Sequence, residues 1–277
     1  MIITSRPVMP SFVRVCVVTA TLAAASPASA QISVEVSPLR VELQAGPGSA
    51  TTQPVTLTNY GKEVIRVRAT MTDWDLTRDG TPQFEGSETG GRFSATAWLR
   101  VAPPEQIVEP GATAVVRFNV TVPQGVEPGG YRTGILFEFE DTSAGLAVAK
   151  RELSFRSRIA TLIYVNTGTP PAATELLDVR VRPSRAGVDV VATVKNSGRK
   201  TVRTKGALVL FDASGAIARE VPVPDVPLLP ESEREVAVPV AIAESSPLAP
   251  GVYRAELKLD LGLAALIVGE TSVRIPQ

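Results

Sequence analysis

Apolar and polar residues alternate with a period of two through most of the chain after residue 30. Successive side chains of a β-strand point to opposite faces, so this period is typical of strands with one face buried and the other in water. The alternation is clearest over residues 65–71, 116–122, 188–194, 236–240 and 253–261, and no comparable helical spacing accompanies it. The pattern predicts an all-β protein.

Turn motifs separate the predicted strands and recur in the same order in both halves of the chain. Gly, Asn, Asp and Pro favour turns because of the backbone angles that they tolerate or impose. Asn59-Tyr60-Gly61 corresponds to Asn196-Ser197-Gly198, Asp79-Gly80 to Ser214-Gly215, and Pro128-Gly129-Gly130 to Pro250-Gly251. We expect two immunoglobulin-like antiparallel β-sandwich domains in tandem.

The repeat also predicts where the domains begin and end. We place the first domain at residues 31–168 and the second at residues 172–277. Pro170-Pro171 lies between them, and consecutive prolines hold a short linker extended. The third pair of turn motifs has a shorter spacing than the first two, so the first copy contains extra residues before Pro128. Residues 81–96, rich in Gly, Ser and Thr, are their expected position.

The N-terminal segment, residues 1–30, has the features of an export signal. Arg6 and Arg14 precede an apolar stretch over residues 15–25, and Ala28-Ser29-Ala30 supplies the small residues that a signal peptidase accepts. We expect cleavage after Ala30 and a periplasmic or otherwise exported protein. The apolar stretch is shorter than the ~20 residues that span a bilayer, so no membrane insertion is expected.

Composition excludes several classes of function. The chain has no histidine, and its single cysteine, Cys16, lies in the predicted signal. The usual general base, thiol nucleophile and zinc ligands are therefore missing, and we predict no enzyme, no cofactor and no metal site. Without Arg6 and Arg14 the 28 basic residues become 26 against 28 acidic ones, a net charge of −2. That balance favours neither nucleic acid nor an anionic membrane as a partner.

One acidic motif has both a functional and a structural interpretation. Asp73, Asp75 and Asp79 with Gly80 resemble part of a calcium-binding loop. The ligand spacing differs from that of such a loop, and Trp74 occupies a position where a polar or small residue is needed. A solvated hairpin turn is the favoured interpretation.

A longer motif resembles a known family. Residues 103–111, which run from a double proline to Pro-Gly, and the following residues 114–118 resemble a loop and strand in the first domain of periplasmic pilus-assembly chaperones. Residues 37–41 resemble the first strand of that domain, and residues 135–139 resemble its sixth. The resemblance covers about residues 33–165, and the second domain is similar only as another bacterial immunoglobulin-like module.

The resemblance implies a protein that lends a strand to an exported, pilin-like subunit and holds the subunit's C-terminal carboxylate with two cations. By position, Arg40 and Arg158 match these cations, and Arg156 is the alternative if the strand is shifted by two residues. Arginine suits the role because its planar guanidinium pairs bidentately with a carboxylate. An outer-membrane usher is a second partner that the resemblance suggests.

The candidate pairing strand departs from the family pattern. Its apolar residues are Leu146, Val148, Leu153 and Phe155, and they fall on two parities. One continuous apolar row would therefore require a β-bulge. Arg151 also stands where the family has a bulky apolar residue.

A second interpretation requires no client protein. Arg40 and Arg158 are then solvent-facing arginines of the kind that alternate with apolar residues and protect edge strands. The chain would be a structural or adhesive module of the cell envelope. The sequence leaves both functions open, the chaperone-like binder and the structural module, and neither needs a catalytic residue.

Overall fold

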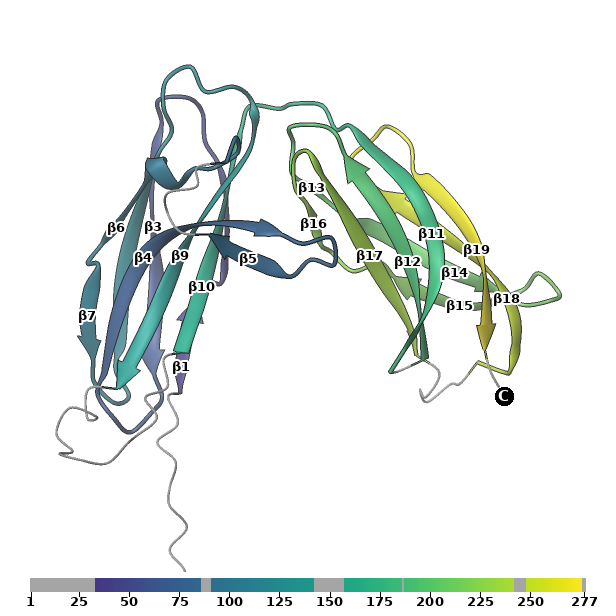
Figure 1. Cartoon of the computed structure of the whole chain (residues 1–277), viewed down its shortest axis with the longest axis horizontal. Coiled ribbons are helices and arrows are strands. Elements are labelled where there is room, and N and C mark those ends of the chain that lie inside the picture. Colours follow the sequence, from purple (N-terminus) through teal and green to yellow (C-terminus); the bar gives the residue numbers. More distant parts are fainter. Residues whose placement is uncertain (1–32, 86–90, 142–156, 186, 242–247, 276–277) are drawn as a thin grey trace, which may run out of the picture. The chain divides into compact units, whose positions relative to one another are not determined.

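The predicted all-β fold is confirmed (Figure 1). The computed structural model describes residues 33–85, 91–141, 157–185, 187–241 and 248–275. Apart from one short 3-10 helix, Thr96–Trp98, the regular elements among these residues are β-strands. Strands β1 to β10 form one group of sheets and strands β11 to β19 form another, with β10 ending at Thr167 and β11 beginning at Thr174.

The first sandwich has two sheets that enclose one core. In order of pairing, one sheet contains β1 (Val34–Ser37), β3 (Ala50–Asn59), β8 (Thr113–Thr121) and β6 (Leu99–Ala102). The other contains β2 (Arg40–Gln44), β10 (Ser157–Thr167), β9 (Gly129–Asp141), β4 (Ile65–Leu76) and β5 (Pro82–Glu85), and β7 (Glu105–Val108) also pairs with β4.

The alternation of side chains along each strand builds this core. On β9, Phe137 and Phe139 are fully buried, while Leu136 and Glu138 face outward and are only partly covered. Truncating a buried phenylalanine to alanine typically costs about 3–5 kcal/mol, because the cavity left behind closes only in part. The burial of alternate residues therefore fixes which face of β9 is the outer one.

The chain passes from one sheet to the other at its first two strands. β1 pairs antiparallel with β3 in one sheet, and β2 pairs parallel with β10 in the other. At the crossing, the Thr56 hydroxyl donates to the Ser37 carbonyl (3.1 Å) and the Thr161 hydroxyl donates to the Pro38 carbonyl (2.9 Å). These bonds hold the crossing in place, and they set where β2 begins to cover β10.

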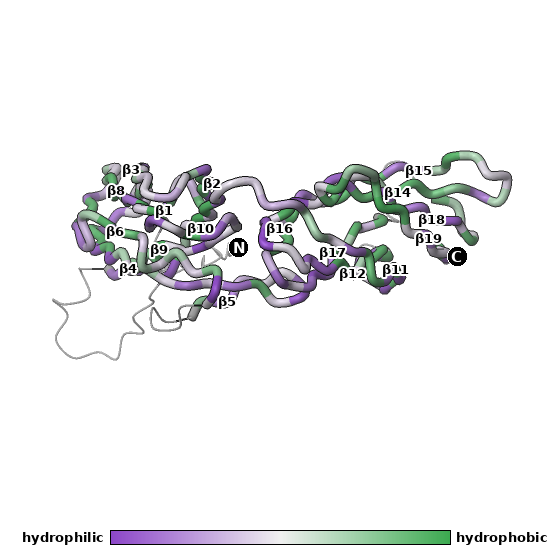
Figure 2. The backbone as a smooth tube through the Cα atoms, turned by 90° about the horizontal axis from the view of Figure 1, so that it is seen from above, coloured by the Kyte–Doolittle hydropathy of each residue, from purple (hydrophilic) through white to green (hydrophobic). Residues whose placement is uncertain are grey.

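The second sandwich has the same kind of construction. One sheet contains β11 (Thr174–Ser184), β12 (Gly187–Asn196) and β17 (Ser232–Ala241), and the other contains β15 (Ile217–Pro222), β14 (Lys205–Phe211), β18 (Gly251–Asp260) and β19 (Ile267–Ile275). A short pair, β13 (Val202–Arg203) with β16 (Pro227–Leu228), lies outside both. Figure 2 shows hydrophilic and hydrophobic residues alternating along the strands of both sandwiches.

A buried asparagine closes the turn after β3. The Asn59 side chain is 1% exposed, and its amide nitrogen donates to the carbonyls of Glu63 (2.8 Å) and Val108 (3.1 Å). Its side-chain oxygen accepts the backbone N–H of Gly61 (2.9 Å). One side chain therefore bonds backbone groups of both the turn and β7.

The corresponding asparagine of the second sandwich makes the same kinds of bond, with one further acceptor. The Asn196 amide donates to the carbonyls of Lys200 (2.8 Å), Leu228 (3.2 Å) and Leu229 (2.9 Å), and its oxygen accepts the Gly198 N–H (3.0 Å). The repeat seen in the sequence is therefore a repeat of hydrogen-bonding function.

Each sandwich also has one tyrosine that folds back on the chain before its strand. The Tyr131 hydroxyl donates to the Glu127 carbonyl (3.0 Å), and the Tyr253 hydroxyl donates to the Ala249 carbonyl (2.8 Å). Both side chains are buried and both bonds reach back four residues, as in the tyrosine corner of immunoglobulin-like folds. The two halves therefore share this second fold-defining bond.

Replacing Asn196 by alanine should lower the free energy of unfolding by about 1–3 kcal/mol, because buried carbonyls lose their donor. Urea denaturation followed by far-UV circular dichroism measures the change. Lys200→Ala is the control, since that exposed side chain lies in the same turn. Equal stability of the two variants would contradict the role given to Asn196.

Candidate functional site

Strand β10 is covered by β9 along its whole length but by β2 over its second half alone. The first backbone hydrogen bond on the β2 side runs from the Leu162 N–H to the Leu39 carbonyl (2.9 Å). Within the described part of the chain, no strand pairs with residues 157–160 on that side. We call this stretch the open edge of β10.

The open edge presents backbone donors and acceptors. Alternate residues of a strand direct their N–H and C=O groups to the same side. Because the Leu162 N–H points to β2, the N–H groups of Arg158 and Ala160 also point to that side, whereas the N–H of Ile159 points to β9. Unpaired backbone groups at a sheet edge are those with which another strand can pair.

Arg40, the first predicted anchor residue, is the first residue of β2 and lies opposite Leu162 in the register of β10. Its side chain is 51% exposed, and its guanidinium is 3.5 Å from the Glu42 carboxylate on the same strand. Arg40 therefore stands where the open edge ends, with about half of its side chain exposed.

Arg158, the second predicted anchor residue, lies on the open edge itself. It stands opposite Glu138 of β9, and its guanidinium is 2.6 Å from the Glu138 carboxylate. The Arg158 side chain is 58% exposed and that of Glu138 is 17% exposed. An acidic side chain of the same protein therefore already neutralises this cation, and the sequence did not indicate that pairing.

The two arginines share the outer face of the sheet, but the structure does not bring them together. Arg158 lies four positions along β10 from Leu162, the neighbour of Arg40, which is about 13 Å at ~3.3 Å per residue. Each guanidinium lies beside an acidic side chain of the same sheet, Glu42 for Arg40 and Glu138 for Arg158. The anchor role of this pair stays a prediction.

The candidate pairing strand falls outside the described residues. Leu146, Val148, Leu153 and Phe155, and the alternative cation Arg156, belong to the stretch from 142 to 156. Their assignment as a pairing strand stays a prediction from the sequence.

A row of four charged residues crosses the outer face beside the open edge. In register, Arg158 of β10 lies opposite Glu138 of β9, Glu138 opposite Arg68 of β4, and Arg68 opposite Glu105 of β7. The Arg68 guanidinium is 3.5 Å from the Glu105 carboxylate. The sequence shows that each residue faces outward, but which ones meet depends on strand order and register.

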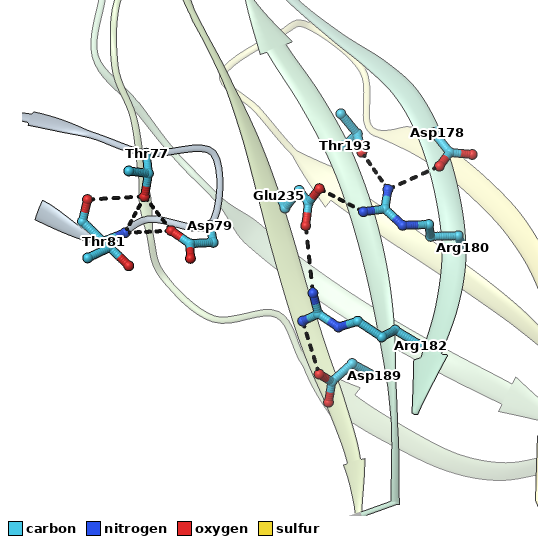
Figure 3. Close-up of polar contacts among 9 residues, drawn as sticks. All are labelled: Thr77, Asp79, Thr81, Asp178, Arg180, Arg182, Asp189, Thr193 and Glu235. Atoms are coloured by element: carbon cyan, nitrogen blue, oxygen red, sulfur yellow. Dashed lines mark hydrogen bonds and ion pairs between the residues drawn. The ribbon is translucent and has the colours of Figure 1, made fainter. Parts of the chain in front are cut away.

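The acidic motif around Asp79 does not converge on a common centre. The Asp79 carboxylate caps its own hairpin turn, accepting the Thr81 N–H (3.0 Å) and a bond from the Thr77 hydroxyl (Figure 3). Asp75 pairs instead with Arg132 at 2.7 Å. The hairpin-turn interpretation accounts for these two residues.

Asp73 has a different structural role. It is 7% exposed, and one carboxylate oxygen accepts the hydroxyls of Ser94 and Thr96 at 2.5 Å each. These bonds attach the end of the extra segment, residues 81–96, to strand β4. The three aspartates thus serve three separate structural purposes.

Among the described residues, no group of three or more Asp, Glu, Cys or His side chains is placed to hold a metal ion. No helix there has the length and hydropathy of a membrane span.

Comparisons with known proteins give a likeness of fold. No family model and no curated protein matches the sequence. The YadV chaperone is 14% identical (87% of this chain, 99% of that one, TM-score 0.43), and the class 5 fimbriae chaperone CfaA is 13% identical (88% and 100%, TM-score 0.46). A chain from the complex of Salmonella enterica SafA pilin with the SafB chaperone is 11% identical (88% and 97%, TM-score 0.42).

The three structures named are of chaperones, one of them in complex with a pilin.

The pKa of Asp79 is held below its ordinary value of 3.8, chiefly by the Thr77 hydroxyl and then by the Thr81 N–H, and Ser214 and Ala216 lower the pKa of Asp212 in the same way. A carboxyl whose pKa is lowered by folding stabilises the protein above its unfolded pKa, and that contribution is lost as the pH falls below it.

The double variant Asp79→Asn, Asp212→Asn should therefore lose less stability than wild type between pH 5 and pH 3. Thermal unfolding at both pH values measures this, and an unchanged acid sensitivity would contradict the capping role.

Proposed function

We propose that this chain is a periplasmic, pilus-chaperone-like protein that binds an exported polypeptide by β-strand pairing. The observation that supports it most directly is the open edge of β10, where Arg158 and Ala160 direct backbone groups away from β9. A partner strand there would extend the sheet by one strand, and main-chain hydrogen bonds would supply much of the affinity.

Export follows from the N-terminal pattern. The charged start, the apolar stretch and Ala28-Ser29-Ala30 favour cleavage after Ala30 and release into the periplasm. A pilin-like subunit, itself exported, is the proposed partner, and an outer-membrane usher is a predicted second one. Both assignments follow from the family resemblance.

The position of Arg40 gives the partner strand a natural end. A strand paired with the open edge would occupy the place that β2 takes further along β10, and β2 begins at Arg40. If that strand runs parallel to β10, its C-terminal carboxylate arrives at the exposed guanidinium of Arg40. We propose that Arg40 holds this carboxylate and that Arg158 supports the strand from its side.

Replacing both Arg40 and Arg158 by alanine should reduce partner capture at least tenfold, because a charge-assisted hydrogen bond and the register that it sets are lost. Both side chains are more than half exposed, so stability should change by less than about 1 kcal/mol. The measurement is the amount of polypeptide bound by the immobilised mature protein from periplasmic extract of the source organism, with its C-terminus identified by mass spectrometry.

Arg117→Ala is the matched control, since Arg117 is an exposed strand arginine on β8 of the other sheet. Undiminished capture by the double variant would show that the two arginines do not anchor the partner. Failure of the wild-type protein to bind any exported polypeptide would favour the structural or adhesive module.

Ala160→Pro tests the edge itself. Proline removes an N–H that faces the open edge and leaves the hydrogen bonds to β9 in place, which is the position where a strand tolerates proline. Capture should fall more than tenfold, because the pyrrolidine ring also blocks the edge, while the circular dichroism spectrum stays that of wild type. Ala160→Ser is the control, because serine keeps the N–H, and this variant should capture the partner as well as wild type does. Equal capture by the proline and serine variants would exclude pairing at this edge.

A further inference from the structure

The row of charges beside the open edge is regular in sign. From β7 through β4 and β9 to β10 it runs Glu105, Arg68, Glu138, Arg158, so each side chain faces opposite charge in the neighbouring strand. Opposite charges directly across strands stabilise a sheet, and like charges destabilise it. The row ends on a cation, because within the described residues no strand lies beyond Arg158.

Arg158 has donors to spare. Its one ionic partner among the described residues is Glu138, at 2.6 Å, on the side of β9, and more than half of its side chain is exposed. A guanidinium carries five N–H donors in a planar fork, so pairing with one carboxylate leaves others for a second acceptor. Arg158 lies on the open edge, where a further strand would pair.

The second sandwich has a comparable charged row whose edge arginine is already satisfied (Figure 3). Arg180 of the edge strand β11 donates to Glu235 (2.7 Å), to the Thr193 hydroxyl (3.1 Å) and to Asp178 (3.4 Å). Three acceptors of the same sandwich therefore surround Arg180, against one for Arg158. Exposure on an edge strand alone does not explain the spare donors of Arg158.

We infer that the partner strand carries an acidic side chain at the outward-facing position beside Arg158, and that Glu138 competes with this side chain for the guanidinium. The inference rests on the proposed pairing at the open edge and adds a rule for the partner's sequence. Arg158 thereby binds an acidic side chain of the partner strand, while Arg40 holds the C-terminal carboxylate of that strand.

The next outward-facing residue of the partner strand would have uncharged neighbours. Ala160 lies two residues after Arg158 on the open edge, and Leu136 lies opposite it on β9. A small and an apolar neighbour favour an apolar partner residue there. On the inner face Ile159 packs against the core of the first sandwich, which also favours an apolar residue. The expected partner segment therefore has one acidic residue, set two positions from an outward apolar one, in an otherwise alternating apolar strand.

The test uses the mature full-length protein and short synthetic peptides of alternating valine and threonine with a free C-terminus. In each pair of peptides, one outward-facing threonine is replaced by glutamate in one peptide and by lysine in the other. Successive pairs carry this charged residue two positions further along the peptide. For the pair in which it lies beside Arg158, the wild-type protein should bind the glutamate peptide about three- to tenfold more tightly than the lysine peptide, as expected for a cross-strand charge pair. Fluorescence anisotropy of labelled peptides gives both dissociation constants.

Two variants separate Arg158 from general electrostatics. Arg158→Glu combined with Glu138→Gln should reverse the preference towards the lysine peptide, and Glu138→Gln alone should increase the preference for glutamate. Arg117→Glu, a reversal of similar size on the other sheet, should leave the wild-type preference unchanged. A preference that follows Arg117→Glu as strongly would overturn the assignment to Arg158.

Two outcomes separate the charge preference at Arg158 from strand pairing at the open edge. Equal binding of both peptides at every place, abolished by Ala160→Pro, would overturn the charge rule and leave strand pairing intact. Binding of neither peptide, or binding that Ala160→Pro does not change, would count against pairing at the open edge and against the charge rule with it.

Discussion

The hydrogen bond from the Leu162 N–H to the Leu39 carbonyl sets the geometry on which the rest of the site depends. It is the first backbone bond on the β2 side of β10, at 2.9 Å, and its acceptor is the residue just before β2. The hydrogen bonds to the Ser37 and Pro38 carbonyls hold the crossing beside it. Because β2 starts there, β10 is covered beyond this point and open before it. The place of Arg40, the length of the open edge and the direction of its free N–H groups all follow from this one contact.

The outer face of the same sheet shows how charge is distributed around such an edge. A row of alternating cations and anions crosses the face, and its partly exposed pairs contribute little to stability. Their value lies in specificity: a row that ends on Arg158 favours an anionic neighbour over a cationic one. Stability comes instead from the buried alternate residues and from the hydrogen bonds of Asn59 and Asn196.

The sequence predicted much of the fold because period-two alternation is a local property. Residues such as Phe137 and Phe139 alternate with polar ones whatever their eventual neighbours, and the Asn-x-Gly motifs close their turns through atoms a few residues apart. The candidate site was predictable to a smaller extent. Arg40 and Arg158 were identified by resemblance, whereas Glu138 as the partner of Arg158 was missed, because the two positions lie on different strands and meet only through the register of β9 and β10.

What the sequence determined by itself is therefore the all-β character of the chain, the outward or inward direction of each strand residue, the repeated turns, and the absence of histidine. The tertiary structure decided which strands are neighbours: that β2 covers half of β10, that Arg40 and Arg158 lie four register positions apart, and that Arg68 stands beside Glu138. The physical reason is that side-chain direction depends on local backbone geometry, while register depends on contacts between segments distant in the chain.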